Sequence, residues 1–400
     1  MTLRPLLSAT LAFGASEAAA KATRLLTVLA VARGLPPAEI GLAAAAMAGG
    51  DILKGLTETG AGQRIIAASD TALEATCLGA ARAMRLWCGG LFIAQIAVAA
   101  LFWASGAHMV ALCLALLAAE HLFMPAGIVS AALAMREGRM RGVATVAGAQ
   151  ICAANLGAAA LALVWPSALA LVLPRLLSAP IWLIAIRRLR PWTPTAVTPA
   201  PLGPFVRFGA SVIGVELVRA LRMQADKLVV GALMGAQALG LYFMAWSAGL
   251  GMASALTAAV SMALFPHAAR GGALRVDLTV ALLAVAPAVA LQSLAAPYYV
   301  PLLFGAEHAH LAPVVATLCL SAIPLAIWQV AALRLRAQGR PDLELAGGAL
   351  LAIALVAAVA LLAPQGLLAA ARGQLVATTF VALACAAPVL LAQRSAKCMP

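Results

Sequence analysis

Charged side chains are concentrated in two apolar stretches of this sequence. The stretch from residue 205 to residue 249 carries five of them within twelve positions: Glu216, Arg219, Arg222, Asp226 and Lys227. Nearer the N-terminus, Glu17, Lys21 and Arg24 are spaced i, i+4 and i+7, so they share one face of a helix. Arginine and lysine bind phosphate groups, whereas carboxylates take up protons or cations, or pair with the arginines.

Such charges are costly inside a membrane, where an arginine or lysine at the bilayer centre costs about 2.5–3.5 kcal/mol. The four cations on these two stretches would together cost on the order of 12 kcal/mol if they faced lipid, which is comparable with the net stability of a typical domain. We therefore expect them to face a polar interior that receives an anion such as phosphate or pyrophosphate. The alternative is a structural role, in which the same groups form salt bridges between helices.

The composition indicates a membrane protein. Hydrophobic residues make up 64% of the 400 residues and charged residues 10%, and the mean hydropathy is +1.00. A soluble domain is usually about half apolar and a quarter charged. The net charge of +13 comes from cations clustered near the ends of apolar stretches, which indicates membrane topology rather than nucleic-acid binding.

Twelve apolar stretches predict an all-α polytopic membrane protein, because a membrane helix needs about 20 residues. They are residues 6–32, 39–57, 84–104, 108–134, 142–165, 167–189, 205–233, 239–266, 276–303, 311–335, 343–362 and 367–392. With a cytoplasmic N-terminus, the cytoplasmic segments hold many cations, such as Arg136, Arg187 and Arg334, whereas the opposite loops hold Arg33 alone. This alternation predicts a multi-pass protein of the inner (cytoplasmic) membrane with both termini in the cytoplasm.

A weak internal repeat predicts two halves. At a shift of 199 residues, Ile40-Gly41-Leu42 aligns with Leu239-Gly240-Leu241 and Glu17 aligns with Glu216. Six spans separate the copies, so both halves run through the membrane in the same direction, and transporters often bind substrate between such halves. The proline-rich "RPWTPTAVTPAPLGP" is typical of a linker. We expect six-helix bundles at residues 1–190 and 205–400, joined by a cytoplasmic linker at 191–204.

The sequence offers little for catalysis, so we expect neither an enzyme nor a cofactor nor a bound metal. The seven cysteines form no CxxC pair, and no Walker loop, HExxH or GxSxG element is present. Glu307, His308 and His310 share one short loop and are a weak candidate for a metal site.

Other charged residues inside predicted spans have simpler interpretations. Glu120 and His121 form either a helix-packing hydrogen bond or part of a proton path. Arg175 and Arg372 lie near the ends of their spans, and we expect both side chains to reach the lipid headgroups.

Several motifs, each short, resemble a known family in their order and spacing. In the second half these are Asp226-Lys227, Gly240-Leu241-Tyr242, Leu264-Phe265-Pro266 through Arg270, "VPLLFGAEHAHLAPVV" and "LRAQGRPDLEL"; in the first half they are "ARGLPPAEIGLAAAA" and "LTETGAGQRII". The chain thus resembles the polysaccharide-transporter, or O-antigen flippase-like, family. That family belongs with the multidrug and toxin extrusion (MATE) proteins to the multidrug/oligosaccharidyl-lipid/polysaccharide exporter superfamily.

The resemblance implies a MATE-like, V-shaped pair of six-helix bundles with alternating access. The implied substrate is an oligosaccharide linked to a polyprenyl pyrophosphate, turned from the cytoplasmic to the outer leaflet for polysaccharide export. The implied partners are this lipid-linked glycan, membrane lipids and a coupling proton or cation, and no nucleic acid. Many relatives have fourteen spans, and the low aromatic content of this chain, 5%, leaves the contacts to sugar unassigned.

We therefore assign two roles as hypotheses. The cations expected to neutralise the pyrophosphate are Lys21, Arg24, Arg219 and Arg222. The carboxylates expected to bind a coupling ion, or to pair with the arginines when substrate is absent, are Glu17, Asp51, Glu216 and Asp226.

Three other functions remain open. A MATE-like drug or cation antiporter would have the same fold but a net acidic cavity, whereas cations outnumber anions in the predicted spans that carry these residues. A membrane glycan polymerase or ligase usually carries a large loop on the far side of the membrane, and the loops predicted there are short. A scaffold without transport would leave the charged spans unexplained.

Overall fold

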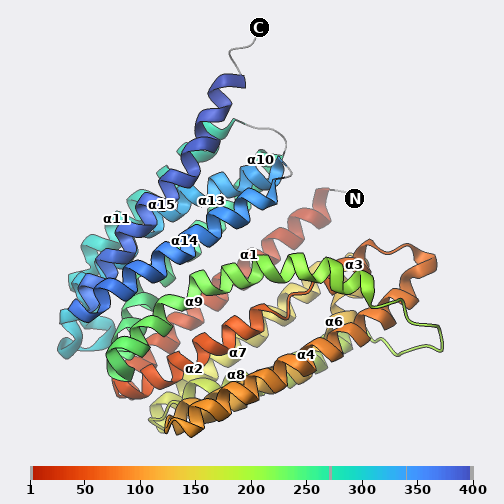
Figure 1. Ribbon diagram of the computed structural model, residues 1–400, viewed down its shortest axis with the longest axis horizontal. Coiled ribbons are helices and arrows are strands. Elements are labelled where there is room, and N and C mark those ends of the chain that lie inside the picture. The colour runs from red at the N-terminus through yellow and green to blue at the C-terminus, as the bar shows by residue number, and fades with distance from the viewer. Residues whose placement is uncertain (1–2, 270–272, 339, 397–400) are drawn as a thin grey trace. The chain divides into compact units, whose positions relative to one another are not determined.

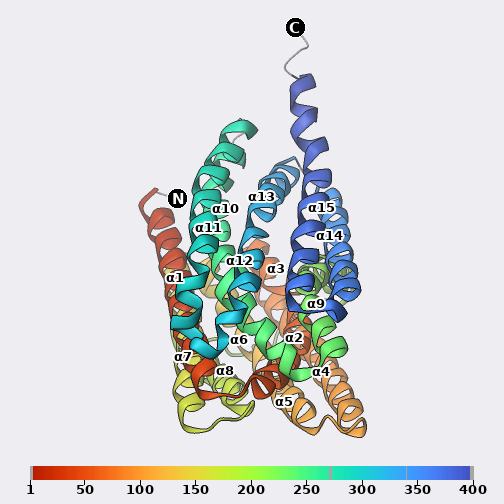
Figure 2. The same cartoon turned by 90° about the vertical axis from the view of Figure 1, so that its left-hand side faces the viewer.

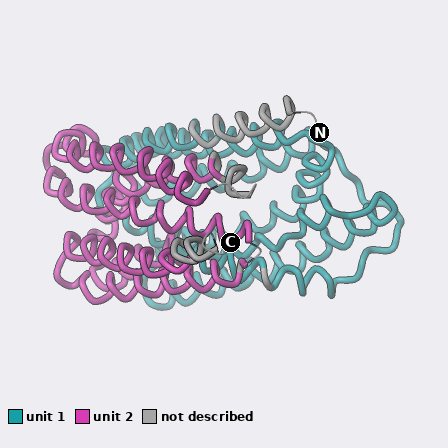
Figure 3. Tube along the Cα trace, turned by 90° about the horizontal axis from the view of Figure 1, so that it is seen from above, with its two compact units in different colours: residues 1–220 teal, residues 221–400 magenta. Residues whose placement is uncertain are grey.

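The fold is helical throughout, in a computed structural model that describes residues 3–269, 273–338 and 340–396. No strand occurs among these residues. The chain divides into two compact units, residues 1–220 and 221–400, which Figure 3 shows in different colours. The division falls within one long helix, α9 (Gly203–Trp246), so this helix contributes to both units. The expected bundle boundaries at residues 190 and 205 stay a prediction.

Unit 1 is built from the first eight α-helices, one short 3-10 helix and the start of α9 (Figure 1). They are α1 (Leu3–Gly34), α2 (Pro37–Gly55), α3 (Ala61–Ala67), the short η1 (Asp70–Ala72), α4 (Leu73–Ala104), α5 (His108–Ala118), α6 (Glu120–Arg136), α7 (Met140–Val164) and α8 (Leu169–Leu189). Within the unit, α7 packs against both α1 and α8, and α4 packs against α5 and α6.

Unit 2 contains the rest of α9 and the helices that follow it (Figure 2). They are the π-helical turn η2 (Ser247–Gly251), α10 (Met252–Ala269), α11 (Leu274–Phe304), η3 (Ala306–Leu311), α12 (Ala312–Leu320), α13 (Ala322–Ala337), α14 (Pro341–Leu362), η4 (Ala363–Gln365) and α15 (Leu367–Ala396). In this unit α15 packs against α12, α13 and α14.

The helices confirm a multi-pass membrane protein. Within the described residues, nine segments are long and apolar enough to cross a membrane. One of them, Gly203–Ser261, covers most of two predicted spans, 205–233 and 239–266. Helices α1 and α2 match the predicted spans 6–32 and 39–57 but are not among the nine. A total of twelve spans is consistent with this structure and stays a prediction.

The chain turns inside α9 at Gly235, which has φ 83° and ψ 177°. Residues with a Cβ atom rarely adopt a positive φ, whereas glycine has no Cβ and adopts it readily. Glycine therefore permits the sharp turn at this position. The helical segment before Gly235, residues 203–234, corresponds to the predicted span 205–233, and the segment after it, residues 236–246, corresponds to the start of the predicted span 239–266. The predicted boundary between these spans is therefore confirmed.

The fourth predicted span of each half is broken at one residue. In unit 1 the break is at Ala119, between α5 and α6, and in unit 2 it is at Ser321, between α12 and α13. A proline follows each break by a few residues, Pro125 in α6 and Pro324 in α13. Proline has no backbone N–H and clashes with the preceding turn, so it favours a kink there.

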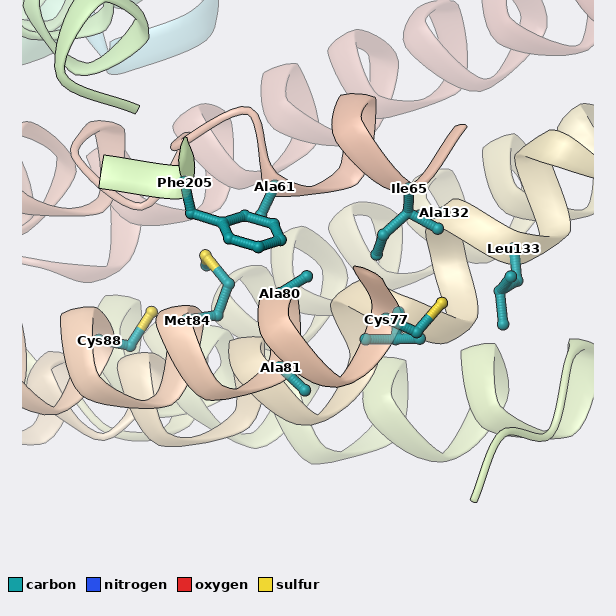
Figure 4. Packing of buried hydrophobic residues seen from close by; sticks show 11 residues of the cluster. Ala61, Ile65, Cys77, Ala80, Ala81, Met84, Cys88, Ala132, Leu133 and Phe205 are labelled. Carbon is teal, nitrogen blue, oxygen red and sulfur yellow. The ribbon is translucent and has the colours of Figure 1, made fainter. Parts of the chain in front are cut away.

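The proline-rich connection before α9 is packed against unit 1. Ala200 N donates to Ala75 O over 2.8 Å, and Trp192 Nε1 donates to Glu74 Oε1 over 3.3 Å. The Phe205 ring, 6% exposed, enters a core formed by α3, α4 and α6, where Figure 4 shows it above Met84 and Ala80 of α4. These contacts fix the start of α9 against α3, α4 and α6, and α6 carries Glu120, one of the charged residues described next.

Candidate functional site

The four cations predicted to bind substrate lie on α1 and α9. Lys21 is half-buried and Arg24 is exposed on α1. On α9, Arg219 is exposed in unit 1, whereas Arg222 is half-buried in unit 2. Glu17 belongs to α1, but its side chain lies outside the part of the structure that is described.

A compact ion-pair cluster joins α2, α6 and α8 in unit 1. Arg175 Nη1 lies 2.7 Å from Asp51 Oδ1, and Arg175 Nε lies 2.6 Å from Glu120 Oε1. The second oxygen of Glu120 lies 2.7 Å from Lys54 Nζ. Glu120 is 5% exposed. The expectation that Arg175 reaches the lipid headgroups is therefore wrong, because its guanidinium bridges two carboxylates of neighbouring helices.

The geometry of this cluster follows from residue type and spacing. Asp51 and Lys54 lie three positions apart on α2 and so share a face, while Glu120 begins α6 at the broken fourth span. The planar guanidinium of Arg175 presents several N–H donors and can hold two carboxylates at once. Arg24 on α1 interacts electrostatically with both Asp51 and Arg175, so one cation predicted from the sequence, Arg24, lies within electrostatic range of the cluster that contains the predicted carboxylate Asp51.

A second group of charges lies where α2 ends and α9 passes. Arg219 Nη1 lies 3.5 Å from Glu216 Oε2, one turn away on α9. Glu58, just after α2 and outside its predicted span, interacts electrostatically with Glu216, Arg219 and Lys54. Partial removal from water and then the Glu216 carboxylate raise the pKa of Glu58, against the opposing effect of the two cations. Glu58 therefore keeps its proton to a higher pH than an ordinary glutamic acid side chain does.

Small residues let α9 approach the end of α2 closely. A Cβ atom added to Gly55 would lie 3.2 Å from the Ala220 Cβ, and one added to Gly60 would lie 2.3 Å from the Phe208 ring. Gly60 also has φ 70°, which other residues rarely adopt. These two glycines therefore allow the backbone of α9 to come near enough for Glu216 to act on Glu58.

Lys54 connects the two groups into one charged network within unit 1. It pairs with Glu120 on one side and interacts with Glu58 on the other. The network contains four cations and four carboxylates: Arg24, Lys54, Arg175, Arg219, Asp51, Glu58, Glu120 and Glu216. With every group ionised, these charges sum to zero. The positive excess that the sequence predicts therefore arises only if one carboxyl of the network is protonated, or if Lys21 is counted as a ninth member.

In unit 2, Asp226 and Lys227 form a deeply buried polar cluster, with exposed fractions of 1% and 2%. Lys227 Nζ lies 3.3 Å from Asp226 Oδ1 and 3.7 Å from the centre of the Trp246 ring. The Tyr242 hydroxyl lies 3.0 Å from Asp226 Oδ2 and 2.6 Å from Gln374 Oε1. The ammonium is therefore held by a carboxylate and by a cation–π contact.

A second buried ion pair in unit 2 links α11 and α13. Arg334 Nη2 donates to Asp277 Oδ2 over 2.9 Å, and both side chains are almost fully buried. Arg334 was counted among the cytoplasmic cations, which stays a prediction. The residue lies in the last turn of α13 and neutralises an acid of the neighbouring helix.

The candidate metal ligands of the loop after α11 bind the backbone instead. His308 Nδ1 lies 3.0 Å from Phe304 O, and His310 Nδ1 lies 3.0 Å from Glu307 O. Among the residues that the structure describes, no group of three or more His, Cys, Asp or Glu side chains is placed to hold a metal ion.

Comparison with known proteins identifies the family. The family model described as "Polysaccharide biosynthesis protein" matches residues 30–313, which is more than half of the chain. This chain belongs to the polysaccharide biosynthesis protein family. A search of curated protein sequences gives no significant match.

Solved structures show that this family member shares the fold of known membrane transporters. The lipid II flippase MurJ in an inward closed conformation matches with a TM-score of 0.79 and 11% identity, over 94% of this chain and 87% of that one. An inward-facing multidrug resistance MATE family transporter of the MOP superfamily matches with a TM-score of 0.68 and 16% identity, over 94% and 95%. A MOP superfamily transporter from Pyrococcus furiosus matches with a TM-score of 0.63 and 16% identity, over 99% and 96%. The predicted helical, MATE-like fold is therefore confirmed.

Sequence reasoning did not assign four members of the charged network to the substrate or coupling site of this polysaccharide biosynthesis protein. They are Lys54, Glu58, Glu120 and Arg175. The signal was present, because an ionisable residue inside an apolar span usually has a partner of opposite charge. The sequence does not show which spans are neighbours. Three of the ion pairs join residues that are more than fifty positions apart in the chain.

Proposed function

We propose that this protein is a flippase that moves a lipid-linked oligosaccharide across the cytoplasmic membrane by alternating access, for polysaccharide export. The observation that carries the proposal is membership of the polysaccharide biosynthesis protein family. The transporter fold supports it, as does a charged network placed on apolar helices. We further propose that both termini lie in the cytoplasm, as the distribution of loop cations favours.

The cations of the network suit a polyprenyl pyrophosphate. In this proposal Lys21, Arg24, Arg219 and Arg222 neutralise the diphosphate, for which arginine provides paired N–H donors. Arg219 is the most favourable, because it is 67% exposed and its contact with Glu216, at 3.5 Å, is long for an ion pair. A diphosphate can therefore replace Glu216 as the partner of Arg219 with little loss of existing interaction.

The carboxylates balance the charge when substrate is absent. We propose that Glu17, Asp51, Glu216 and Asp226 either pair with cations in the empty protein or hold the coupling proton or cation. The described contacts of Asp51 with Arg175, of Glu216 with Arg219 and of Asp226 with Lys227 support the pairing role. When a diphosphate takes one of the cations, the released carboxylate becomes available to a proton, which keeps the network near neutral.

A second candidate is a drug or cation antiporter. The balanced charge of the unit 1 network favours it, because an anion-selective site is expected to be net positive. Efflux of a cationic dye from cells that express the protein separates the two candidates. Dye efflux that is lost in Asp51→Asn would support the antiporter, whereas no efflux together with glycan export would support the flippase.

The central experiment is complementation of glycan export in a strain that lacks the gene. Arg219→Ala is expected to reduce surface glycan at least tenfold while the protein stays in the membrane at normal level. The matched control is Arg207→Ala, which removes an exposed arginine near the start of the same helix and is expected to leave export intact. Normal export by Arg219→Ala would remove Arg219 from the substrate site, and export in the absence of the gene would overturn the proposed function.

A further inference from the structure

A single histidine lies at the break in the fourth span of unit 1. His121 is the second residue of α6, directly after the break at Ala119 and next to Glu120 of the ion-pair cluster. Pro125 stands four positions later, so the His121 carbonyl lacks the backbone N–H that a helix would supply, and the proline ring crowds it. The helix is therefore least constrained at the position of this side chain.

The surroundings of the ring fix its tautomer. His121 is 2% exposed, and its Nε2 lies 2.9 Å from Gln95 Oε1 on α4. Gln95 Nε2 donates to Leu114 O of α5 over 2.9 Å, so the amide nitrogen of Gln95 is occupied and its oxygen faces the ring. In the neutral imidazole Nε2 must then carry the hydrogen, and Nδ1 presents a free lone pair.

Nδ1 is a buried nitrogen that has no hydrogen-bond partner among the described residues. Buried polar atoms are almost always satisfied, and an exception commonly marks a functional site or an atom that gains its partner in another state. Because the unprotonated Nδ1 atom has a free lone pair, it can either accept a hydrogen bond from a donor or bind a proton.

The charged groups that act on the ring come from three helices. They are Glu120 on α6, Lys54 on α2 and Arg175 on α8. These groups are already paired with one another, and Gln95 and Leu114 O are the neutral polar groups of α4 and α5. A proton on His121 would thus add a positive charge beside a carboxylate that is already shared by two cations.

We propose that Nδ1 of His121 is the binding site of a proton whose uptake is coupled to a conformational change of unit 1. A proton from water adds to the Nδ1 lone pair and converts the imidazole to imidazolium, while Nε2–H continues to donate to Gln95. The inference names a coupling ion and a residue that the proposed function leaves open, and it rests on that function only in assuming that the protein changes conformation during transport.

The coupling follows from the missing acceptor. Once protonated, Nδ1–H is a buried, charged donor with no acceptor among the described residues, which disfavours the present conformation. A conformation in which the α5–α6 break opens, so that water or the Glu120 carboxylate reaches Nδ1, is favoured in its place. The proton therefore shifts the population between two states because it interacts differently with them.

The test is solid-state or solution NMR of the full chain in lipid nanodiscs, with ¹⁵N-labelled histidine. The signal of His121 is identified by its loss in His121→Gln. The titration covers the range from about pH 8 to pH 5. At pH 8 the signal is expected to report the Nε2–H tautomer, and as the pH falls it is expected to show that the ring gains a second proton on Nδ1. Gln95→Leu removes the group that fixes the tautomer and is expected to yield a mixture of both. A ring that keeps one neutral tautomer over the whole range would overturn the proposal.

A second measurement connects the proton to the conformational change. The test quantity is the protection factor, which is the intrinsic exchange rate of an unprotected amide divided by the measured hydrogen–deuterium exchange rate at the same pH. For amides around the α5–α6 break, the protection factor is expected to fall severalfold on acidification in the wild type and to be insensitive to pH in His121→Gln. His108→Gln, which removes an exposed histidine at the start of α5, is the control and should behave as the wild type does. If the protection factor of His121→Gln retains the wild-type pH dependence, the coupling is refuted. Because neither readout needs a glycan, failure of the export assay and failure of this inference are distinguishable.

Discussion

At the scale of single residues, Arg175 joins carboxylates of two different helices in the unit 1 network. It contacts Asp51 and Glu120 directly and acts on Arg24. Removing one partner of a buried ion pair costs about 3–5 kcal/mol, because the remaining charge has no counterpart. We expect Arg175→Ala to lose an amount of this order and Arg175→Lys to lose less, since an ammonium keeps the charge but cannot span both carboxylates.

The measurement is the thermal unfolding midpoint of each variant in one detergent. Arg82→Ala, at an exposed position of α4, serves as the control and is expected to match the wild type. Equal midpoints for Arg175→Ala and Arg82→Ala would show that the bridge contributes nothing to stability.

Glu58 gives the protein a pH-dependent stability at the same scale. Its pKa in the folded protein is raised above the ordinary value of about 4.5, chiefly by removal from water and next by Glu216. The folded state therefore binds a proton more tightly than the unfolded state does, so this stabilising contribution is complete below about pH 4.5 and is lost as the pH rises through the folded pKa. Glu58→Gln, which resembles the protonated form, is expected to remove that decline.

Unfolding midpoints of the wild type and Glu58→Gln should thus agree at acid pH and separate as the pH rises, with the variant the more stable at neutral pH. A difference between the two that is constant across the pH range would contradict the assigned role of Glu58.

At the scale of helices, the position of α1 depends on close packing against α7. Ser16 Oγ donates to Ala144 O over 2.9 Å, Thr27 Oγ1 donates to Asn155 O over 2.8 Å, and Asn155 Nδ2 donates to Ala20 O over 3.1 Å. A Cβ atom on Gly34 would lie 2.5 Å from the backbone oxygen of Ala162. Small residues and interhelical hydrogen bonds are the usual means by which membrane helices associate.

Gly34→Ala is therefore expected to push α1 away from α7 and to destabilise the protein by about 1–3 kcal/mol, the usual cost of overpacking. Because α1 carries Lys21 and Arg24, transport should fall as well. Gly90→Ala is the matched control, since nothing lies within 4 Å of the added methyl group on α4. A Gly34→Ala protein with the unfolding midpoint and export of Gly90→Ala would exclude this role of the α1–α7 contact.

The fold was far more predictable from the sequence than the site. Apolar stretches of about 20 residues and the turn at Gly235 follow from local rules, and they located helices α5 to α15 to within a few residues. Helix α4 begins at Leu73, well before its predicted span 84–104. The partners of Asp51 and Arg175 depend on which helices are neighbours, which no local rule determines. Arg175 was assigned to headgroups because snorkelling is the default for a cation near a helix end. Glu58 was overlooked because its removal from water and its neighbour Glu216, 158 positions away, both depend on the fold.

At the scale of the whole molecule, α9 is the one described helix that carries charged residues of both units. Glu216 and Arg219 lie in unit 1, whereas Arg222, Asp226 and Lys227 lie in unit 2. A continuous helix transmits a rotation along its length, so a change in the partner of Arg219 can reach Asp226 two turns later. The helical hydrogen bonds around residues 220 and 221 should therefore be needed for transport.

Leu221→Pro tests this requirement, because proline removes one helical hydrogen bond and introduces a kink at a cost of about 3 kcal/mol. Membrane helices tolerate proline, so the variant is expected to insert into the membrane and to retain its purification profile while export falls at least tenfold. Leu221→Ala preserves the helix and serves as the control, with export expected near the wild-type level. Export by Leu221→Pro equal to that of Leu221→Ala would mean that the two units work without a rigid α9, and the charged groups on that helix would then act within each unit separately.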